Sequence, residues 1–206
     1  MCHLTLPLSG QPTASRALPL MSNIRFAMKR QKTRHVGLDS QCLSYLLDGI
    51  AGIGEPTDSL DEEKKALLRT WFYQPGTFIL TETVISEVAK IRNLERRKFH
   101  ESFIQTLFLD YPICDLTAVQ ARAMHFELHH PEPSDCRILA EAEELQLDFV
   151  LTYDHDFWRR LSAVSSPSKL IKPSSYWSSL RIPKGARPVT VPHHTNPLSQ
   201  QLWWRW

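Results

Sequence analysis

The chain has 206 residues, 42% of them hydrophobic, which is enough to build one full core. Its apolar runs fall well short of the roughly 20 residues that a membrane-spanning helix needs, so no membrane association is predicted. The four cysteines are scattered and include no C-x-x-C pair, which is typical of a reduced, cytoplasmic protein.

The charges are unevenly distributed along the chain, although the formal net charge is only +2. All 22 acidic residues lie between Asp39 and Asp156, together with only 10 Lys and Arg, so this segment carries a net charge of −12. The residues before and after it are basic and contain no acid. This pattern is consistent with a cation site flanked by arms that attract a polyanion, although basic tails without a function are as common.

The chain divides into an arm, a folded region and a tail. Residues 1–33 lack sustained periodicity and are predicted to form a basic, disordered arm. Residues 34–181 are predicted to fold, and the Pro-rich, basic and aromatic residues 182–206 to have little packed structure. Apolar runs predict strands at residues 35–39, 78–80 and 149–153, with shorter strands around Ile113 and at 170–171.

Helical periodicity fills the segments between these strands. Helices are predicted from Ser40, from a capping box at Ser59, after Leu80, over 94–109, from Thr117, from Ser134 and over 173–180. Strands that alternate with helices predict an α/β domain with a parallel sheet and right-handed crossovers.

Four acids are predicted to meet at one edge of this sheet, where ligands bind in open α/β folds. Asp39 and Asp154 end apolar runs, Glu87 lies about two turns into the helix after a strand, and Asp135 lies in a first helical turn. Asp148 begins a strand and belongs to the opposite edge. Close carboxylates repel by roughly 4 kcal/mol per pair near a protein surface, so the cluster predicts a Mg²⁺ or Mn²⁺ site.

Five segments resemble, in order, the motifs of PIN-domain nucleases. They are Val-Gly-Leu-Asp-Ser at 36–40, Ile-Ser-Glu-Val at 85–88, Pro-Ser-Asp at 133–135 with Ile-Leu-Ala at 138–140, Leu-Thr-Tyr-Asp-His-Asp-Phe at 151–157, and Ile-Lys-Pro at 171–173 with Tyr-Trp at 176–177. The similarity covers about residues 34–180. Gln41 departs from the pattern, since a small residue or Asn is frequent there, and both arms are longer than a compact toxin needs.

The resemblance implies a three-layer α/β/α fold with a central parallel sheet of about four to five strands. It also implies a metal-dependent endoribonuclease that hydrolyses RNA phosphodiester bonds and, more narrowly, a VapC-like toxin of a type II toxin–antitoxin pair. An antitoxin protein and a second copy of the chain are then the expected partners. Two alternatives stay open: a catalytically silent PIN-like module that binds RNA or protein, and a DNA-directed or structure-specific nuclease.

Roles for individual residues follow from this expected mechanism. Asp39, Asp135 and Asp154 are expected to ligate Mg²⁺ or Mn²⁺, with Glu87 completing the cage or orienting the attacking water. Ser40 and Thr152 are expected to hydrogen-bond these carboxylates. Asp156 either faces the site from an extended segment or caps the following turn.

Basic and aromatic clusters offer further candidate contacts with RNA. Arg92, Arg96, Arg97 and Lys98 are predicted either to follow an RNA backbone or to form an ordinary helix face paired with nearby glutamates. Three tryptophans beside Arg205 are expected either to stack on bases or to dock on the protein itself; they are Trp203, Trp204 and Trp206. The His125 and His129 pair lacks the H-E-x-x-H pattern of metalloproteases.

Overall fold

The computed structural model describes residues 34–206 except residues 53, 109–110 and 114, and the described residues belong to one compact unit. The predicted N-terminal arm of residues 1–33 therefore lies outside the described residues. No helix among the residues described is both long and apolar enough to span a membrane.

Four short parallel strands form the central sheet, in the order β2-β1-β3-β4. Their bounds are Val36–Leu38 for β1, Phe78–Ile79 for β2, Phe149–Leu151 for β3 and Lys169–Ile171 for β4. Val36 is in register with Phe78 on one side and with Phe149 on the other. The predicted parallel sheet is confirmed, but the strand expected at Ile113 is wrong, because that residue lies outside any strand.

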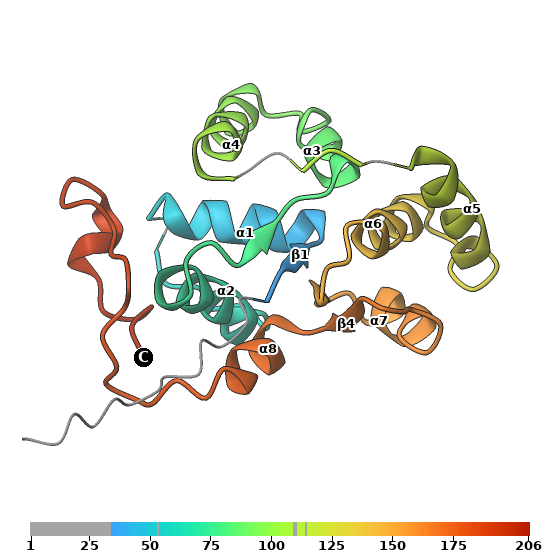
Figure 1. Cartoon of the computed structure of the whole chain (residues 1–206). Coiled ribbons are helices and arrows are strands. Elements are labelled where there is room, and N and C mark those ends of the chain that lie inside the picture. Colours follow the sequence, from blue (N-terminus) through green and yellow to red (C-terminus); the bar gives the residue numbers. More distant parts are fainter. Residues whose placement is uncertain (1–33, 53, 109–110, 114) are drawn as a thin grey trace, which may run out of the picture. The chain divides into compact units, whose positions relative to one another are not determined.

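Helices cover both faces of the sheet, as the three-layer prediction requires. Figure 1 shows α2 and α8 on one side of the strands and α5, α6 and α7 on the other. The helices are α1 (Ser40–Ile50), α2 (Asp61–Tyr73), α3 (Glu82–Val88), α4 (Leu94–Leu107), α5 (Leu116–Glu127), α6 (Pro133–Glu144), α7 (His155–Leu161) and α8 (Pro173–Ser179). The core between them includes the fully buried Leu38, Leu43, Leu67 and Leu139.

Four helices have other caps than predicted. Asp39 caps α1 in place of Ser40, which becomes the first helical residue. The predicted cap Ser59 has no capping role: α2 follows Leu60, whose backbone N–H donates to Asp58 Oδ1 at 3.0 Å. Asp115 caps α5 in place of Thr117, because its Oδ1 accepts from Ala118 N at 2.9 Å.

The start of α6 also differs from the prediction. The helix begins at Pro133, and Glu132 occupies the N-cap position that the sequence pattern assigns to Ser134. The fixed φ of proline suits the first helical position, so the helix starts earlier in the chain. Asp135 becomes the third helical residue and remains in the first turn.

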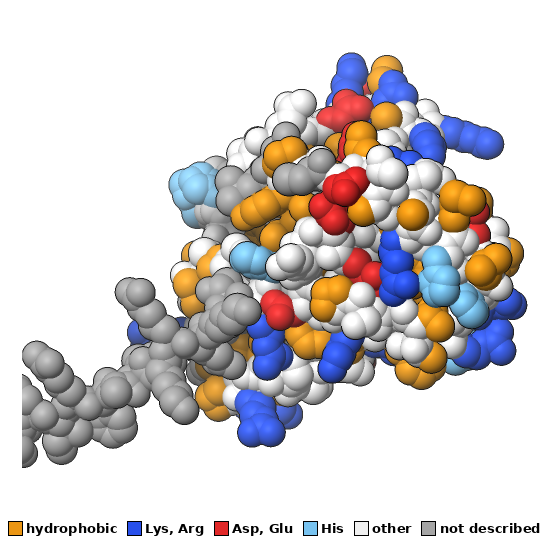
Figure 2. Space-filling model, turned by 45° about the vertical axis from the view of Figure 1, so that its right-hand side comes forward, with side chains coloured by type: hydrophobic (Ala, Val, Ile, Leu, Met, Phe, Trp, Pro, Cys, Tyr) orange, Lys and Arg blue, Asp and Glu red, His pale blue; other side chains and the backbone are white. Residues whose placement is uncertain are grey.

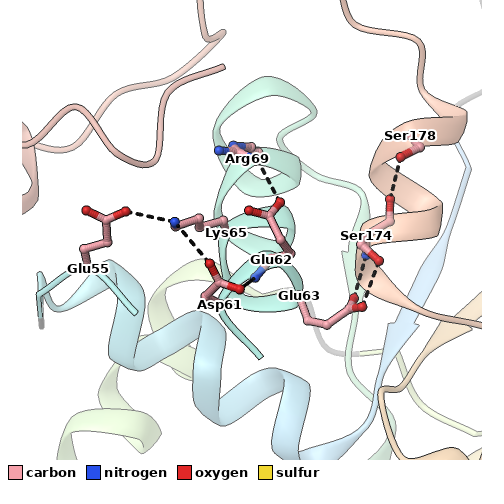
Figure 3. A network of polar contacts seen from close by, with 8 residues as sticks. All are labelled: Glu55, Asp61, Glu62, Glu63, Lys65, Arg69, Ser174 and Ser178. Atoms are coloured by element: carbon pink, nitrogen blue, oxygen red, sulfur yellow. Dashed lines mark hydrogen bonds and ion pairs between the residues drawn. The ribbon is translucent and has the colours of Figure 1, made fainter. Parts of the chain in front are cut away.

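A half-buried carboxylate joins α2 to α8. Glu63 on α2 accepts hydrogen bonds from Ser174 N and Ser174 Oγ, both at 2.8 Å (Figure 3). On the same helix, Lys65 pairs with Glu55 at 2.8 Å and with Asp61 at 3.4 Å. Because the residue before α8 makes no side-chain cap, Glu63 supplies the acceptor that this helix needs at its first turn.

The tail packs against α2, whereas its composition predicts little packed structure. Trp204 is fully buried, packs against Phe72 with ring centroids 4.6 Å apart, and donates from Nε1 to Leu198 O at 3.1 Å. The backbone of Trp206 donates to Tyr73 Oη at 3.0 Å. A 3-10 helix over Pro197–Gln200 is its only regular element among the described residues. Of the two expectations for these tryptophans, the structure supports docking on the protein itself.

Candidate functional site

All four predicted acids line one cavity of about 350 Å³. The cavity lies where β1 and β3 end, and β1 has its neighbours β2 and β3 on opposite sides. The strand order reverses there, and this is the usual ligand position in open α/β sheets. The lining consists of Asp39, Ser40, Gln41, Glu87, Glu132, Ser134, Asp135 and Asp154.

Asp39 is the most buried of these acids, with only 5% of its surface exposed. Its backbone N–H continues the sheet by donating to Leu151 O at 3.0 Å, and its Oδ1 caps α1 by accepting from Cys42 N at 2.5 Å. Burial raises the pKa of Asp39 to about 6, opposed by the hydrogen bonds from Thr152 and Cys42 and reinforced by the charge of Asp135. Its ionised form is therefore destabilised in this position.

Thr152 connects Asp39 with Asp154. Its hydroxyl hydrogen-bonds the Asp39 carboxylate and accepts from Asp154 N at 3.0 Å. Asp154 caps α7, since its Oδ1 accepts from Asp156 N at 2.8 Å and from Phe157 N at 3.0 Å. A buried threonine thus contacts two of the site acids.

Asp135 is held by a histidine that the sequence did not single out. His130 Nε2 lies 2.9 Å from Asp135 Oδ2, and the imidazole stacks on Phe157 with centroids 5.8 Å apart. Burial raises the pKa of Asp135; the His130 hydrogen bond opposes this effect and the charge of Asp154 adds to it. The sequence marks His130 only as part of a break before a proline, which gives no sign of this contact.

Glu87 reaches the cavity from the last turn of α3 and accepts a hydrogen bond from Ser40 Oγ. Ser40 therefore contacts a site carboxylate, as expected. A fifth acid, Glu132, also lines the cavity, and Ser134 Oγ donates to its Oε1 at 3.3 Å. Glu132 follows no strand, so the strand-end argument that identified Asp39 and Asp154 could not find it.

Asp156 lies outside the cavity lining. It is exposed in the first turn of α7 and pairs with Arg159 at 2.7 Å, which lowers its pKa. The expectation that it faces the site from an extended segment is wrong, because the helix begins at His155. The expected capping role is wrong too, because Asp154 caps this helix.

The predicted basic cluster also lies outside the cavity lining, and intramolecular contacts occupy two of its members. Arg96 pairs with Asp48 at 2.6 Å, and Arg97 donates to Ala89 O at 3.2 Å. Arg92 and Lys98 are exposed. Figure 2 shows Lys and Arg side chains gathered at the top of the view, the height at which α4 lies in Figure 1.

The acidic side chains that line the cavity offer carboxylate oxygens, which are the ligands that hard divalent cations prefer. In the part of the chain that the structure describes, however, no three His, Cys, Asp or Glu side chains lie close enough together to hold a metal ion. Mg²⁺ is commonly bound through one or two carboxylates while keeping several waters. The open cavity therefore suits a hydrated cation better than one enclosed by protein ligands.

No family model matches the chain, and no curated protein matches it.

Proposed function

We propose that this chain is a PIN-like, Mg²⁺- or Mn²⁺-dependent endoribonuclease. The observation that carries the proposal is the convergence of Asp39, Glu87, Asp135 and Asp154 on one cavity at the reversal point of a parallel sheet. These acids come from four separate segments of the chain. Two of them, Asp39 and Asp135, have raised pKa values because burial destabilises their ionised forms, and a bound cation would offset that destabilisation.

Each side chain then has a defined task. Asp39, Asp135 and Asp154 hold the cation directly or through water, while Thr152 and His130 keep three carboxylates in position. Glu87, fixed by Ser40, orients the attacking water. A bound divalent cation supplies Lewis-acid polarisation of the phosphoryl group and neutralises charge on the leaving oxygen. In-line attack by water would leave a 5′-phosphate and a 3′-hydroxyl.

The narrower proposal is that the enzyme is a VapC-like toxin in the cytoplasm, restrained by an antitoxin and active as a homodimer. It rests on the motif resemblance at residues 36–40, 85–88, 133–140 and 151–157. Co-purification with the product of a neighbouring small reading frame would support it. A chain that stays monomeric and co-purifies with no inhibitor protein would leave only the broader nuclease proposal.

The first test is cleavage of a labelled RNA in Mg²⁺ or Mn²⁺ by wild type and by Asp39→Asn. We expect the substitution to reduce cleavage at least 100-fold and EDTA to abolish it. Asp148→Asn is the matched control, because it makes the same charge change at the opposite end of the sheet, where Asp148 accepts from His35 N at 3.0 Å. Cleavage that survives both Asp39→Asn and EDTA would overturn the metal mechanism.

A silent PIN-like binding module is the second candidate, and the openness of the carboxylate cluster favours it. Mn²⁺ titration separates the two, because a cation that binds the folded state raises the unfolding temperature. A rise that is lost in Asp39→Asn supports the enzyme, and no rise supports the silent module. Parallel assays with tRNA, mRNA, single-stranded DNA and duplex DNA distinguish a ribonuclease from a DNA-directed or structure-specific nuclease.

A further inference from the structure

A second hollow, of about 310 Å³, adjoins the carboxylate cavity. The two share Ser40, Gln41 and Glu87 in their linings, so these residues form the wall between them. The rest of the second lining is less acidic and more apolar than the first. It consists of Ser44, Val88, Lys90 and Ile91, and Glu87 is the only acid among the described residues that line this hollow. A ligand that spans both hollows would meet carboxylates at one end and an ammonium beside apolar side chains at the other.

Lys90 has no anionic partner among the described residues, in contrast to Arg96 and Arg97. Within the described part of the chain, no carboxylate lies within ion-pair distance of its ammonium. Its backbone donates to Glu87 O at 3.0 Å, which places it one turn after a site acid. Arg96 and Arg97, in contrast, are engaged by Asp48 and Ala89 O. Lys90 is therefore a cation beside the site that remains available to an external anion.

Gln41 stands at the wall between the two hollows with a fixed orientation. Tyr153 Oη donates a hydrogen bond to the amide oxygen of Gln41, Oε1. The Nε2 group keeps its two hydrogens for a ligand, because an amide donates only through nitrogen. Tyr153 itself stacks on Tyr45 with centroids 5.3 Å apart, which restrains the ring that holds Gln41.

We propose that the second hollow binds the nucleotide next to the scissile phosphate of a single-stranded RNA, with Lys90 contacting the adjacent phosphate. Gln41 donates to that nucleotide, and Val88 with Ile91 forms an apolar surface against its sugar or base. A nucleotide enters such a hollow only when it is unstacked, as in loops and single strands. The inference rests on the proposed function, and it names the form of RNA that this site accepts.

The test measures RNA binding without cleavage. In the Asp39→Asn background with EDTA, we would follow the anisotropy of a labelled single-stranded RNA from about 50 to about 200 mM salt. Lys90→Gln should weaken binding similarly for different sequences and should reduce the slope of log K against log salt by about 0.7, the value for one lost phosphate contact on a single strand. Lys90→Arg keeps the charge and should retain the slope.

Lys169→Gln is the matched control, since it removes the same charge from an exposed position at the amino end of β4. It should leave the slope unchanged. Equal slopes for Lys90→Gln and Lys169→Gln, or no RNA binding at all, would overturn the subsite. Because this measurement needs no turnover, it is independent of the cleavage assay. If wild type cleaves RNA and Lys90→Gln leaves KM unchanged, the subsite is wrong and the proposed function stands. If wild type binds RNA but does not cleave it, the proposed function is wrong, and the binding measurement still decides whether Lys90 contacts RNA.

Discussion

At the scale of single residues, the buried carboxyl of Asp39 makes stability depend on pH. Burial raises its pKa from 3.8 to about 6 in the folded protein, so folding favours the protonated form. The stabilisation is fully present below the unfolded pKa and is lost as pH rises through the folded pKa. Between pH 4 and pH 7, metal-free wild type should lose about 3 kcal/mol relative to Asp39→Asn, at about 1.4 kcal/mol for each pH unit between the two pKa values.

Urea unfolding in EDTA at several pH values checks this expectation. The two proteins should be nearly equal in stability around pH 4, and the asparagine variant should be more stable at pH 7.5. Because Asp135 is present in both proteins, its own raised pKa largely cancels from the difference. A difference that stays constant across the range would show that Asp39 ionises as freely in the folded protein as in the unfolded chain.

The site residues divide by the kind of information that reveals them. Asp39 and Asp154 follow apolar strands, so the position of strand ends predicts where their side chains meet. Glu132 and His130 enter the site because the chain turns before Pro133, and this path depends on tertiary packing. Asp156 shows the opposite error: the sequence suggests an extended segment where α7 has already begun.

At the scale of elements, α1 and α2 pack closely because α1 has a glycine at their contact. A Cβ added at Gly49 would lie 2.8 Å from Leu68 Cδ1 and 3.0 Å from Leu68 Cγ, and Leu68 is buried. Overpacking of this kind costs about 1–3 kcal/mol, and the better helix propensity of alanine returns at most about 1 kcal/mol. Gly49→Ala should therefore destabilise the protein by about 1 kcal/mol in urea unfolding.

Two further variants identify the cause of that loss. Gly54→Ala adds a methyl group into open space and should leave the free energy of unfolding unchanged. Leu68→Ala removes the side chain that the methyl group added by Gly49→Ala would meet, so its cost should be smaller in the Gly49→Ala background. Additive costs would show that α1 and α2 do not meet at this point.

The alternation of elements was predictable from hydrophobic periodicity, whereas helix starts were predicted less well. Asp115 caps α5 although Thr117 lies nearby, and α2 and α6 begin after Leu60 and Glu132 without a side-chain cap, although Ser59 and Ser134 are suitable capping residues. Local sequence cannot choose between adjacent capping residues, because the choice depends on where the helix packs. The false strand around Ile113 includes the adjacent Pro112, and proline lacks the N–H that a sheet ladder needs.

At the scale of the whole molecule, the tail is part of the core although its composition suggests otherwise. Its prolines and short 3-10 helix give little periodic signal, and its order comes from single side chains that dock on α2. Leu198 and Trp204 are fully buried and are joined by the Trp204 Nε1 hydrogen bond. Asn196 Nδ2 donates to Ile50 O at 2.7 Å, which ties the tail to the end of α1 as well. Local hydrophobic periodicity cannot predict such contacts, because they join segments that are distant in sequence.

Trp204→Ala should consequently destabilise the entire unit and not only the tail. Truncation of a buried tryptophan costs about 3–5 kcal/mol, and because Trp204 packs against Phe72 the loss should appear in a single urea transition followed by circular dichroism. Leu202→Ala, at a side chain that is 69% exposed, should change stability by less than about 0.5 kcal/mol. An unchanged transition midpoint for Trp204→Ala would mean that the tail docks without contributing to the fold. The acidic cavity would then be held by the sheet and its own helices alone.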